Sequence, residues 1–386
     1  TRFKCDWSSD VCSSDLISLR VIPSIFEIGN TACVRIFAMT WNICGHEAAT
    51  AFLKEHTQPE KLRHAYLITG PEGVGRTTLA LAFIKALNCL NPPAPGEFCD
   101  QCFACRQINA RAFSDLMLLT PLEGHQDLRI DQIREMQQAL ALAPYQAKYR
   151  IVLIQDFQRA TAAASNALLK SLEEPPARAV LILTADAQES LLETIASRCE
   201  ILRLRPLPVD AATHCLTEAY QIPPEQAKLL AHLTSGRIGA AVKLYQNPDL
   251  VSAYEDALDT LAELLAANRR QRLQFVESLS RKKGSLRESA ADLIAIWLTY
   301  WRDVLIASSD AEIALVNQSR QDAIQQVAQK MSFAEIHTIV EACEKALDQL
   351  EKYINPRLVL ENLVLHMPIL GAEEPRKAAR NAPSND

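Results

Sequence analysis

The residues with the most recognisable chemistry form a glycine-rich stretch, GPEGVGRTT, at residues 70–78. In phosphate-binding loops, glycines at this spacing let backbone N–H groups surround phosphates at a helix N-terminus. A lysine then reaches the outer phosphates, and a Ser or Thr hydroxyl holds magnesium. The residues at these positions here are Gly70, Gly73, Gly75, Arg76, Thr77 and Thr78. Arg76 stands where the lysine belongs, and its bulkier planar guanidinium does not simply replace a compact ammonium.

The segments on either side indicate whether this stretch is a phosphate loop or only a glycine turn. Residues 65–69 (AYLIT) have the composition of a buried strand, and residues 78–87 (TLALAFIKAL) have the apolar face of a helix. A plain turn between a strand and a helix often has similar spacing. With both neighbours in place, the sequence favours a nucleotide-binding fold whose site has lost a decisive residue.

Two further polar positions follow expected strands. Residues 151–154 (IVLI) form a continuous apolar run, typical of a strand buried in a parallel sheet, and Gln155 and Asp156 come directly after it. A hydrolysing ATPase of this type carries Asp and then Glu here, for magnesium and for the attacking water. Gln155 cannot supply the first carboxylate. The site therefore lacks a magnesium ligand in addition to the loop lysine that Arg76 replaces. Thr184 ends the strand expected at residues 180–184, where such ATPases place a polar residue that senses the terminal phosphate.

Four cysteines form a second constellation. Cys99, Cys102 and Cys105 follow one another at three-residue spacing, and Cys89 lies ten residues upstream of the first. Four soft thiolates are the tetrahedral set that zinc prefers, and they leave no open position for a catalytic water. We therefore expect a structural zinc ion; the alternative is a set of reduced free thiols. With eleven cysteines in the whole chain and four of them clustered, the sequence points to a reducing compartment.

Length and composition limit the classes of protein. At 386 residues the chain is too long for one compact core and is expected to form two or three domains. Its 48% hydrophobic and 22% charged residues are typical of a soluble globular protein. A net charge of −6 argues against coating nucleic acid by bulk charge. No apolar run approaches the ~20 residues of a membrane span, so no membrane association is expected.

The two ends of the chain differ from the rest. Residues 1–16 have no helical or strand period and resemble translated sequencing-adapter sequence, and residues 17–38 are apolar but interrupted by charge and proline. Met39 precedes the first regular stretch, so we expect residues 1–38 to be a non-native extension and translation to begin at Met39; a genuine extension is the alternative. The polar residues 371–386 are expected to be a disordered tail.

The pattern between these ends predicts an α/β domain followed by helices. Further elements are expected as helices at residues 47–55, 130–142, 166–174 and 191–196 and strands at residues 114–119 and 200–204, then three short helices within residues 209–247 and long helices at residues 290–306, 333–353 and 356–365. No strand signal appears after residue 250. The tryptophans of the first long helix lie at helical spacing and are interpreted as core.

Several motifs together resemble a known family. The stretch NALLKSLEEPP (residues 166–176), the triplet SRC (residues 197–199), the four-cysteine insertion and the altered loop are similar to the delta-prime subunit family of the bacterial DNA polymerase III clamp loader, within the AAA+ proteins. The resemblance covers residues 41–368. It implies an AAA+ domain with a parallel sheet at residues 39–208, with a zinc module at 89–105, a helical lid at 209–248 and an all-α collar for oligomerisation at 249–370.

The resemblance also bears on the lid and on the turn before the loop. Active relatives carry GSxR at the start of the third lid helix, with an arginine that touches the nucleotide. Aligning Gly236 with that motif puts Gly239 at the arginine position. The turn Gly45-His46 corresponds to one that lies against the adenine in related ATPases. The loop lysine, the magnesium aspartate and the lid arginine are thus all absent from one site. Their absence argues against turnover of ATP and Mg²⁺ by this chain.

The function that the resemblance implies is that of a stator. The chain would join gamma/tau and delta subunits, help load the beta sliding clamp onto primed DNA in the cytoplasm, and have no independent activity within the DNA polymerase III holoenzyme, a nucleotidyltransferase complex. Arg198 would act in trans as an arginine finger in a neighbouring ATPase site; a structural salt bridge is the alternative. Arg129, Lys148 and Lys170 are candidate phosphate contacts or solvated surface charges. The rival functions are an autonomous or gamma/tau-like AAA+ ATPase, in which Arg76 still supports turnover, and a zinc-dependent scaffold unconnected with replication.

Overall fold

The computed structural model describes Trp41 and residues 43–121, 127–281, 284–309, 311 and 313–370. The expectations for residues 1–38, for a start at Met39 and for a tail at residues 371–386 therefore lie outside the described residues.

A parallel five-stranded sheet forms the first domain, as the sequence predicts. Its strands are β1 (Ala65–Thr69), β2 (Leu116–Leu119), β3 (Arg150–Ile154), β4 (Ala179–Ala185) and β5 (Glu200–Arg203). The strand order is β2-β3-β4-β1-β5, and every pairing is parallel. Because all strands run the same way, their carboxyl ends meet at one edge. That edge brings the glycine-rich loop after β1 together with the polar residues that follow β3 and β4.

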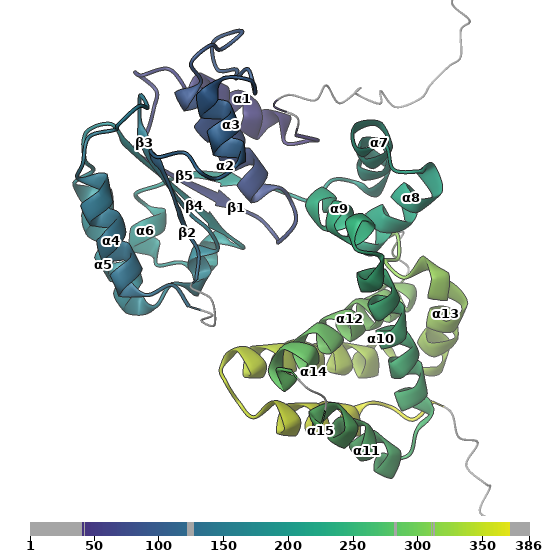
Figure 1. The fold of residues 1–386 in the computed structure, drawn as a ribbon. Helices are drawn as coiled ribbons and strands as arrows, with labels where there is room; N and C mark the ends of the chain where they lie inside the picture. Colours follow the sequence, from purple (N-terminus) through teal and green to yellow (C-terminus); the bar gives the residue numbers. More distant parts are fainter. Residues whose placement is uncertain are drawn as a thin grey trace, which may run out of the picture. The chain divides into compact units, whose positions relative to one another are not determined.

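Alternating side chains bury both faces of this sheet. Tyr66 and Ile68 of β1 point into one apolar cluster, whereas Ala65 and Leu67 point into another. The helices of this domain are α1 (Glu47–Glu55), α2 (Arg76–Asn88), α3 (Phe103–Asn109), α4 (Ile130–Leu140), α5 (Ala162–Glu173) and α6 (Glu193–Ala196), with 3-10 turns at Phe157–Arg159 and Gln188–Ser190. Figure 1 shows α1 to α3 on one side of the sheet and α4 to α6 on the other.

Some helix boundaries differ from expectation for identifiable reasons. Helix α5 begins four residues before the predicted residue 166, because the Thr161 side chain accepts a hydrogen bond from the Ala164 N–H and caps the helix. Helix α2 begins at Arg76 rather than at residue 78, since the loop feeds directly into it. Helix α3, which follows Cys102, was not predicted.

Three short helices follow the sheet domain, as predicted: α7 (Val209–Tyr220), α8 (Pro224–Leu233) and α9 (Ile238–Gln246). Their apolar core includes Ala212, Leu216 and Ala231, and it also receives Cys44 from the segment before α1. Cys44 and Cys215 form a disulfide with their Cα atoms 6.1 Å apart. The expectation of a reducing compartment gave no reason to predict this bond.

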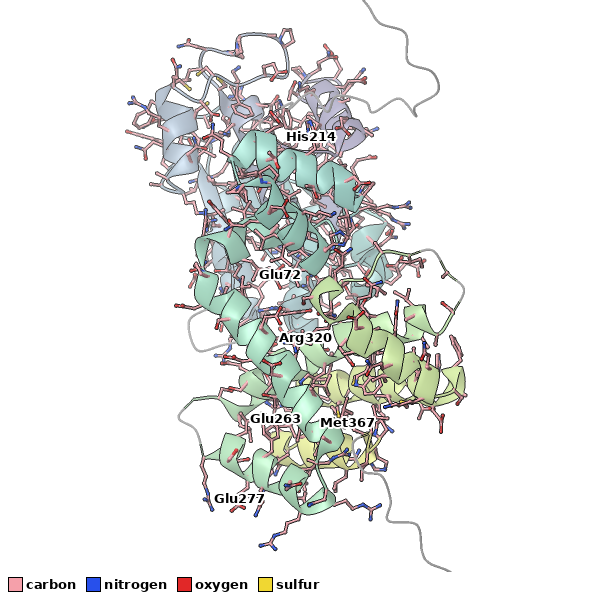
Figure 2. The ribbon with its side chains drawn as sticks, turned by 90° about the vertical axis from the view of Figure 1, so that its right-hand side faces the viewer. Glu72, His214, Glu263, Glu277, Arg320 and Met367 are labelled. Carbon is pink, nitrogen blue, oxygen red and sulfur yellow. A yellow bond between two sulfur atoms is a disulfide. The ribbon has the colours of Figure 1, made fainter. Side chains whose placement is uncertain are left out.

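The regular elements in the rest of the described chain are helices. They form α10 (Pro248–Ala266), α11 (Arg269–Ser280), α12 (Leu286–Ala307), α13 (Gln321–Lys330), α14 (Phe333–Glu351) and α15 (Pro356–His366), with a 3-10 turn at Gln318–Arg320. Trp297 and Trp301 of α12 are 0% exposed, so the interpretation of the tryptophans as core is confirmed. Arg320 ties its turn to α10 by ion pairs with Glu255 and Asp259, at 2.9 and 2.7 Å (Figure 2).

A buried cation holds two ends of this helical domain together. The Arg272 guanidinium donates to the carbonyl oxygens of Leu264, Val364, Met367 and Pro368 at 2.6–2.9 Å (Met367 is labelled in Figure 2). Leu264 and Val364 lie in the last turns of α10 and α15, and Met367 and Pro368 directly follow α15. The carbonyl ends of helices carry partial negative charge, which favours a cation there. Burial lowers the pKa of Arg272. The guanidinium therefore donates hydrogen bonds to carbonyls at both helix ends and links them.

No helix in the described part of the chain is both long and apolar enough to cross a membrane.

We expect Arg272→Met to destabilise the helical domain by about 3 kcal/mol or more, because it leaves several buried carbonyl groups without donors. Denaturation followed by tryptophan fluorescence measures this directly, since Trp297 and Trp301 are buried in the same domain. Arg281→Met is the matched control, because Arg281, directly after α11, forms an exposed ion pair with Glu277. Equal stability of the two variants would show that Arg272 is not the tie described.

Candidate functional site

The glycine-rich loop lies between β1 and α2, at the carboxyl edge of the sheet. Gly73 and Gly75 have φ values of 80° and 109°, a left-handed region that favours glycine, and they curve the chain into the helix N-terminus. Gly70 donates its N–H to the carbonyls of Ala185 and Asp186, which anchors the loop to the end of β4. The backbone is therefore that of a phosphate-binding loop, as predicted.

Arg76 is held by two acids of its own chain. Its guanidinium lies 3.0 Å from the Asp156 carboxylate and 2.7 Å from the Asp186 carboxylate, and only 7% of its side chain is exposed. Gln158 donates a further hydrogen bond to Asp186 at 2.9 Å. The charge that would reach a nucleotide's outer phosphates is thus neutralised internally. Asp186 and Gln158 were not singled out from sequence, although Asp186 follows a central strand at the functional edge.

The residues that would hold magnesium are engaged with each other. Gln155 donates from Nε2 to the Thr77 hydroxyl at 3.4 Å. The Asp156 N–H donates to the Thr184 hydroxyl at 3.0 Å, so both expected polar positions belong to this cluster. Thr78 is exposed on the first turn of α2. The structure thus brings the predicted loop, Asp156 and Thr184 together, but the Asp156 carboxylate pairs with Arg76 and Gln155 offers no carboxylate for magnesium.

The lid closes on the same loop. The N–H groups of Gly239 and Ala240, in the first turn of α9, both point to the Gly73 carbonyl, at 2.8 and 3.3 Å. The loop carbonyl therefore satisfies the free donors of the lid helix. A Cβ atom on Gly239 would lie 2.9 Å from the Gly73 oxygen, so a side chain there would force the lid away. Arg237 adds a hydrogen bond from its guanidinium to the Glu72 carbonyl at 3.3 Å.

The turn before α1 closes the other side of the loop. His46 Nε2 lies 3.1 Å from the Val74 carbonyl oxygen. Burial lowers the pKa of His46, so the ring stays neutral, and because a carbonyl only accepts, Nε2 carries the hydrogen. The turn expected against an adenine is thus fixed to the loop itself.

The four cysteines converge as predicted. The Sγ atoms of Cys89, Cys99, Cys102 and Cys105 all lie within 4.8 Å of one another. Backbone N–H groups of Cys99, Cys102 and Cys105 donate to neighbouring sulfurs at 3.3–3.5 Å. Burial raises the pKa of the Cys102 thiol, but N–H donors from Cys105 and Leu90 outweigh it and bring that pKa to about 6. The donor set and its thiolate-stabilising contacts fit a structural zinc ion.

Arg198 lies away from the phosphate loop of its own chain. It follows α6 and precedes β5, whose first residue, Glu200, pairs with Tyr66 near the start of β1. Arg198 is therefore at the amino edge of the sheet, separated from the loop by the length of the strands, roughly 10 Å or more at ~3.3 Å per residue. Its guanidinium donates to the Thr194 carbonyl at 2.8 Å and to Glu173 at 2.9 Å.

The three candidate phosphate contacts come from different segments. Arg129 precedes α4, Lys148 precedes β3 and Lys170 lies in the last turn of α5. Their role stays a prediction.

Comparison with known proteins bears on what this arrangement is. Two family models match the chain, described as "DNA polymerase III, delta subunit" over residues 45–208 and "DNA polymerase III, delta subunit, C terminal" over residues 248–367. DNA polymerase III subunit delta' of Bacillus subtilis is 29% identical over 80% of this chain and 92% of its own length. The chain belongs to the delta-prime family of DNA polymerase III clamp-loader subunits.

Two other relatives are similar to this chain over different lengths. Subunit delta' of Pseudomonas aeruginosa is 36% identical over 44% of this chain, and the match spans 51% of that protein. Subunit tau of Bacillus subtilis is 26% identical over 84% of this chain, and the match spans 60% of tau. The similarity to tau thus extends over most of this chain, and that to the Pseudomonas delta' over less than half of it.

We expect one zinc ion per chain in protein prepared under reducing conditions. Cys102→Ser removes one of four ligands and should lose most of the metal, while leaving the distant sheet edge intact. Metal analysis of both proteins measures this, with Cys343→Ser, a buried cysteine outside the cluster, as control. Metal-free parent protein, or a Cys102→Ser variant that keeps its zinc, would contradict the site.

We expect Arg76→Met to destabilise the loop by about 1–3 kcal/mol, because Asp156 and Asp186 then face each other without a cation. Hydrogen exchange of residues 70–79 measures the loss. Neutralising both acids in the same chain, with Asp156→Asn and Asp186→Asn, should restore most of it. Arg134→Met, at an exposed ion pair, is the control. If Arg76→Met leaves exchange unchanged, or the triple variant recovers nothing, the two ion pairs do not hold the loop.

Proposed function

We propose that this chain is a non-hydrolysing stator of a clamp loader. It would join gamma/tau and delta subunits, act in the cytoplasm on the beta sliding clamp and primed DNA, and leave ATP hydrolysis to its neighbours. The observation that carries the proposal is the closure of its phosphate loop by Arg76, Asp156 and Asp186. Family membership supports the proposed assembly, and the internal ion pairs of the loop support the proposed role within it.

Three features of one site oppose hydrolysis. The cation at the lysine position is bound by its own acids, the Thr77 hydroxyl interacts with Gln155, and α9 rests its first turn on Gly73. A nucleotide would have to break all three contacts and would still find no magnesium carboxylate from Gln155. The same contacts fix the loop and the lid to the sheet domain, and a rigid domain suits a stator.

Arg198 supports a contribution in trans. It lies at the sheet edge opposite its own loop, and 36% of its side chain is exposed. Its ion pair with Glu173 is open to solvent, and exposed pairs contribute only about 0–1 kcal/mol. A phosphate group of a neighbouring site could therefore recruit this guanidinium at small cost, where it would stabilise charge developing on the transferring phosphoryl group.

A gamma/tau-like ATPase is the second candidate, because tau of Bacillus subtilis matches 84% of this chain. That match includes the fold that both kinds of subunit share. The ion pairs of Arg76 and the Gln155–Thr77 contact separate the two functions and favour the stator.

We expect Arg198→Ala, assembled with gamma/tau and delta subunits, to lower DNA-stimulated ATP hydrolysis and clamp loading. An arginine finger contributes ~10³–10⁵ in rate at its own site, and the loss for the complex is smaller if other sites act independently. Arg198→Lys should rescue poorly, since an ammonium lacks the planar fork.

Glu173→Gln is the matched control, because it removes the partner of Arg198 in the free chain and keeps the guanidinium. It should leave hydrolysis unchanged or raise it. A complex containing Arg198→Ala that assembles normally and loads clamps at the parent's rate would show that Arg198 is a structural residue.

A further inference from the structure

The disulfide between Cys44 and Cys215 joins two parts of the chain whose movement would open the phosphate loop. The segment that carries Cys44 is anchored in the sheet domain, since Trp41 and Ile43 belong to an apolar cluster with β1 and α2. Cys44 itself is buried in the apolar core of the lid, with Leu216 and Ala231. The bond therefore spans 171 residues and crosses from one domain into the other.

Both ends of this bond are mechanically coupled to the loop. Two residues after Cys44, His46 donates to the Val74 carbonyl. On the lid side, α7 carries Cys215 and packs against the helix pair that ends in α9, whose first turn binds the Gly73 carbonyl. Among the described residues, the lid contacts the loop through the two N–H groups that donate to Gly73 and through the Arg237 hydrogen bond to Glu72. The disulfide adds a covalent link between the lid and the segment before α1.

We propose that Cys44 and Cys215 form a reversible dithiol–disulfide site, a latch that fixes the lid on the phosphate loop when oxidised and frees it when reduced. Its reaction partners are low-molecular-weight thiols and disulfides of the glutathione class. This inference does not depend on the stator role, because it concerns the isolated chain.

The exchange chemistry balances with such a partner. In oxidation, one cysteine thiolate attacks the small disulfide and releases one small thiol, forming a mixed disulfide. The second cysteine thiolate then attacks the protein sulfur and releases the second small thiol. Two protons and two electrons pass from the cysteines to the small disulfide, which becomes two thiols. Reduction is the reverse, with a thiol pair as the donor.

Because both sulfurs are buried, reduction of the bond depends on movement of the lid. Cys44 is 9% exposed and Cys215 is 7% exposed, so a small thiol reaches the sulfurs only after the lid moves away. The closed lid therefore slows reduction of the bond, and reduction proceeds when the lid opens transiently. The four clustered cysteines differ from this pair, because their sulfurs all lie within 4.8 Å of one another and could hold a metal ion.

The test uses the purified full chain equilibrated in reduced or in oxidised glutathione, with zinc present. Peptide mapping after alkylation measures the Cys44–Cys215 bond, and hydrogen exchange measures residues 70–79 and 209–246. Oxidised protein should carry the bond, and reduction should speed exchange in these segments by about tenfold or more. Exchange in the helical domain around Trp297 should stay unchanged.

Variants separate the latch from other effects of the buffer. In the Cys215→Ser and Cys44→Ala variants, the amide hydrogens of residues 70–79 and 209–246 should exchange rapidly in both buffers. Cys343→Ser should behave as the parent. If either variant fails to fold, the comparison of the parent protein in reduced and in oxidised glutathione still tests the proposal. Free thiols at both positions in oxidised glutathione, a bond that resists reduction in the folded chain, or equal exchange in both buffers would each overturn the proposal.

Discussion

The double ion pair of Arg76 is the constraint on which the account of this subunit depends. A guanidinium at a helix N-terminus beside a phosphate loop would ordinarily attract anions. Here Asp156 and Asp186 supply the anions from the ends of β3 and β4. The interaction thus links the loop to two central strands and pairs the charge at the position of the loop lysine with acids of the same chain. This internal pairing is the observation on which the proposed stator role rests.

Closure of the site also explains how the lid can rest so near the loop. An arginine at position 239 would need space for a side chain, whereas Gly239 lets the first turn of α9 approach the Gly73 carbonyl directly. Arg76 and Gly239 thus both take part in internal contacts of the loop, which supports the proposed stator role.

Much of this could be predicted from sequence because it depends on local patterns. The strand at residues 65–69 and the helix at residues 47–55 appear with the predicted bounds, since apolar runs and amphipathic periods determine them. The cysteine spacing likewise brought four sulfurs together. The partners of Arg76 could not be found this way, because Asp186 lies 110 residues away and only the parallel register places it there. The start of α5 was missed because a cap, not an apolar period, determines it.

The most direct measurement is nucleotide binding and hydrolysis by the isolated chain. Calorimetric titration with ATP and Mg²⁺, together with a steady-state hydrolysis assay, should show no magnesium-dependent binding at the loop and no turnover above background. The same result is expected with primed DNA present, because DNA supplies neither the missing cation nor the missing carboxylate. Stoichiometric ATP binding that depends on Mg²⁺ and leads to turnover would contradict the account, since it would show that Arg76 leaves its acids and serves the nucleotide.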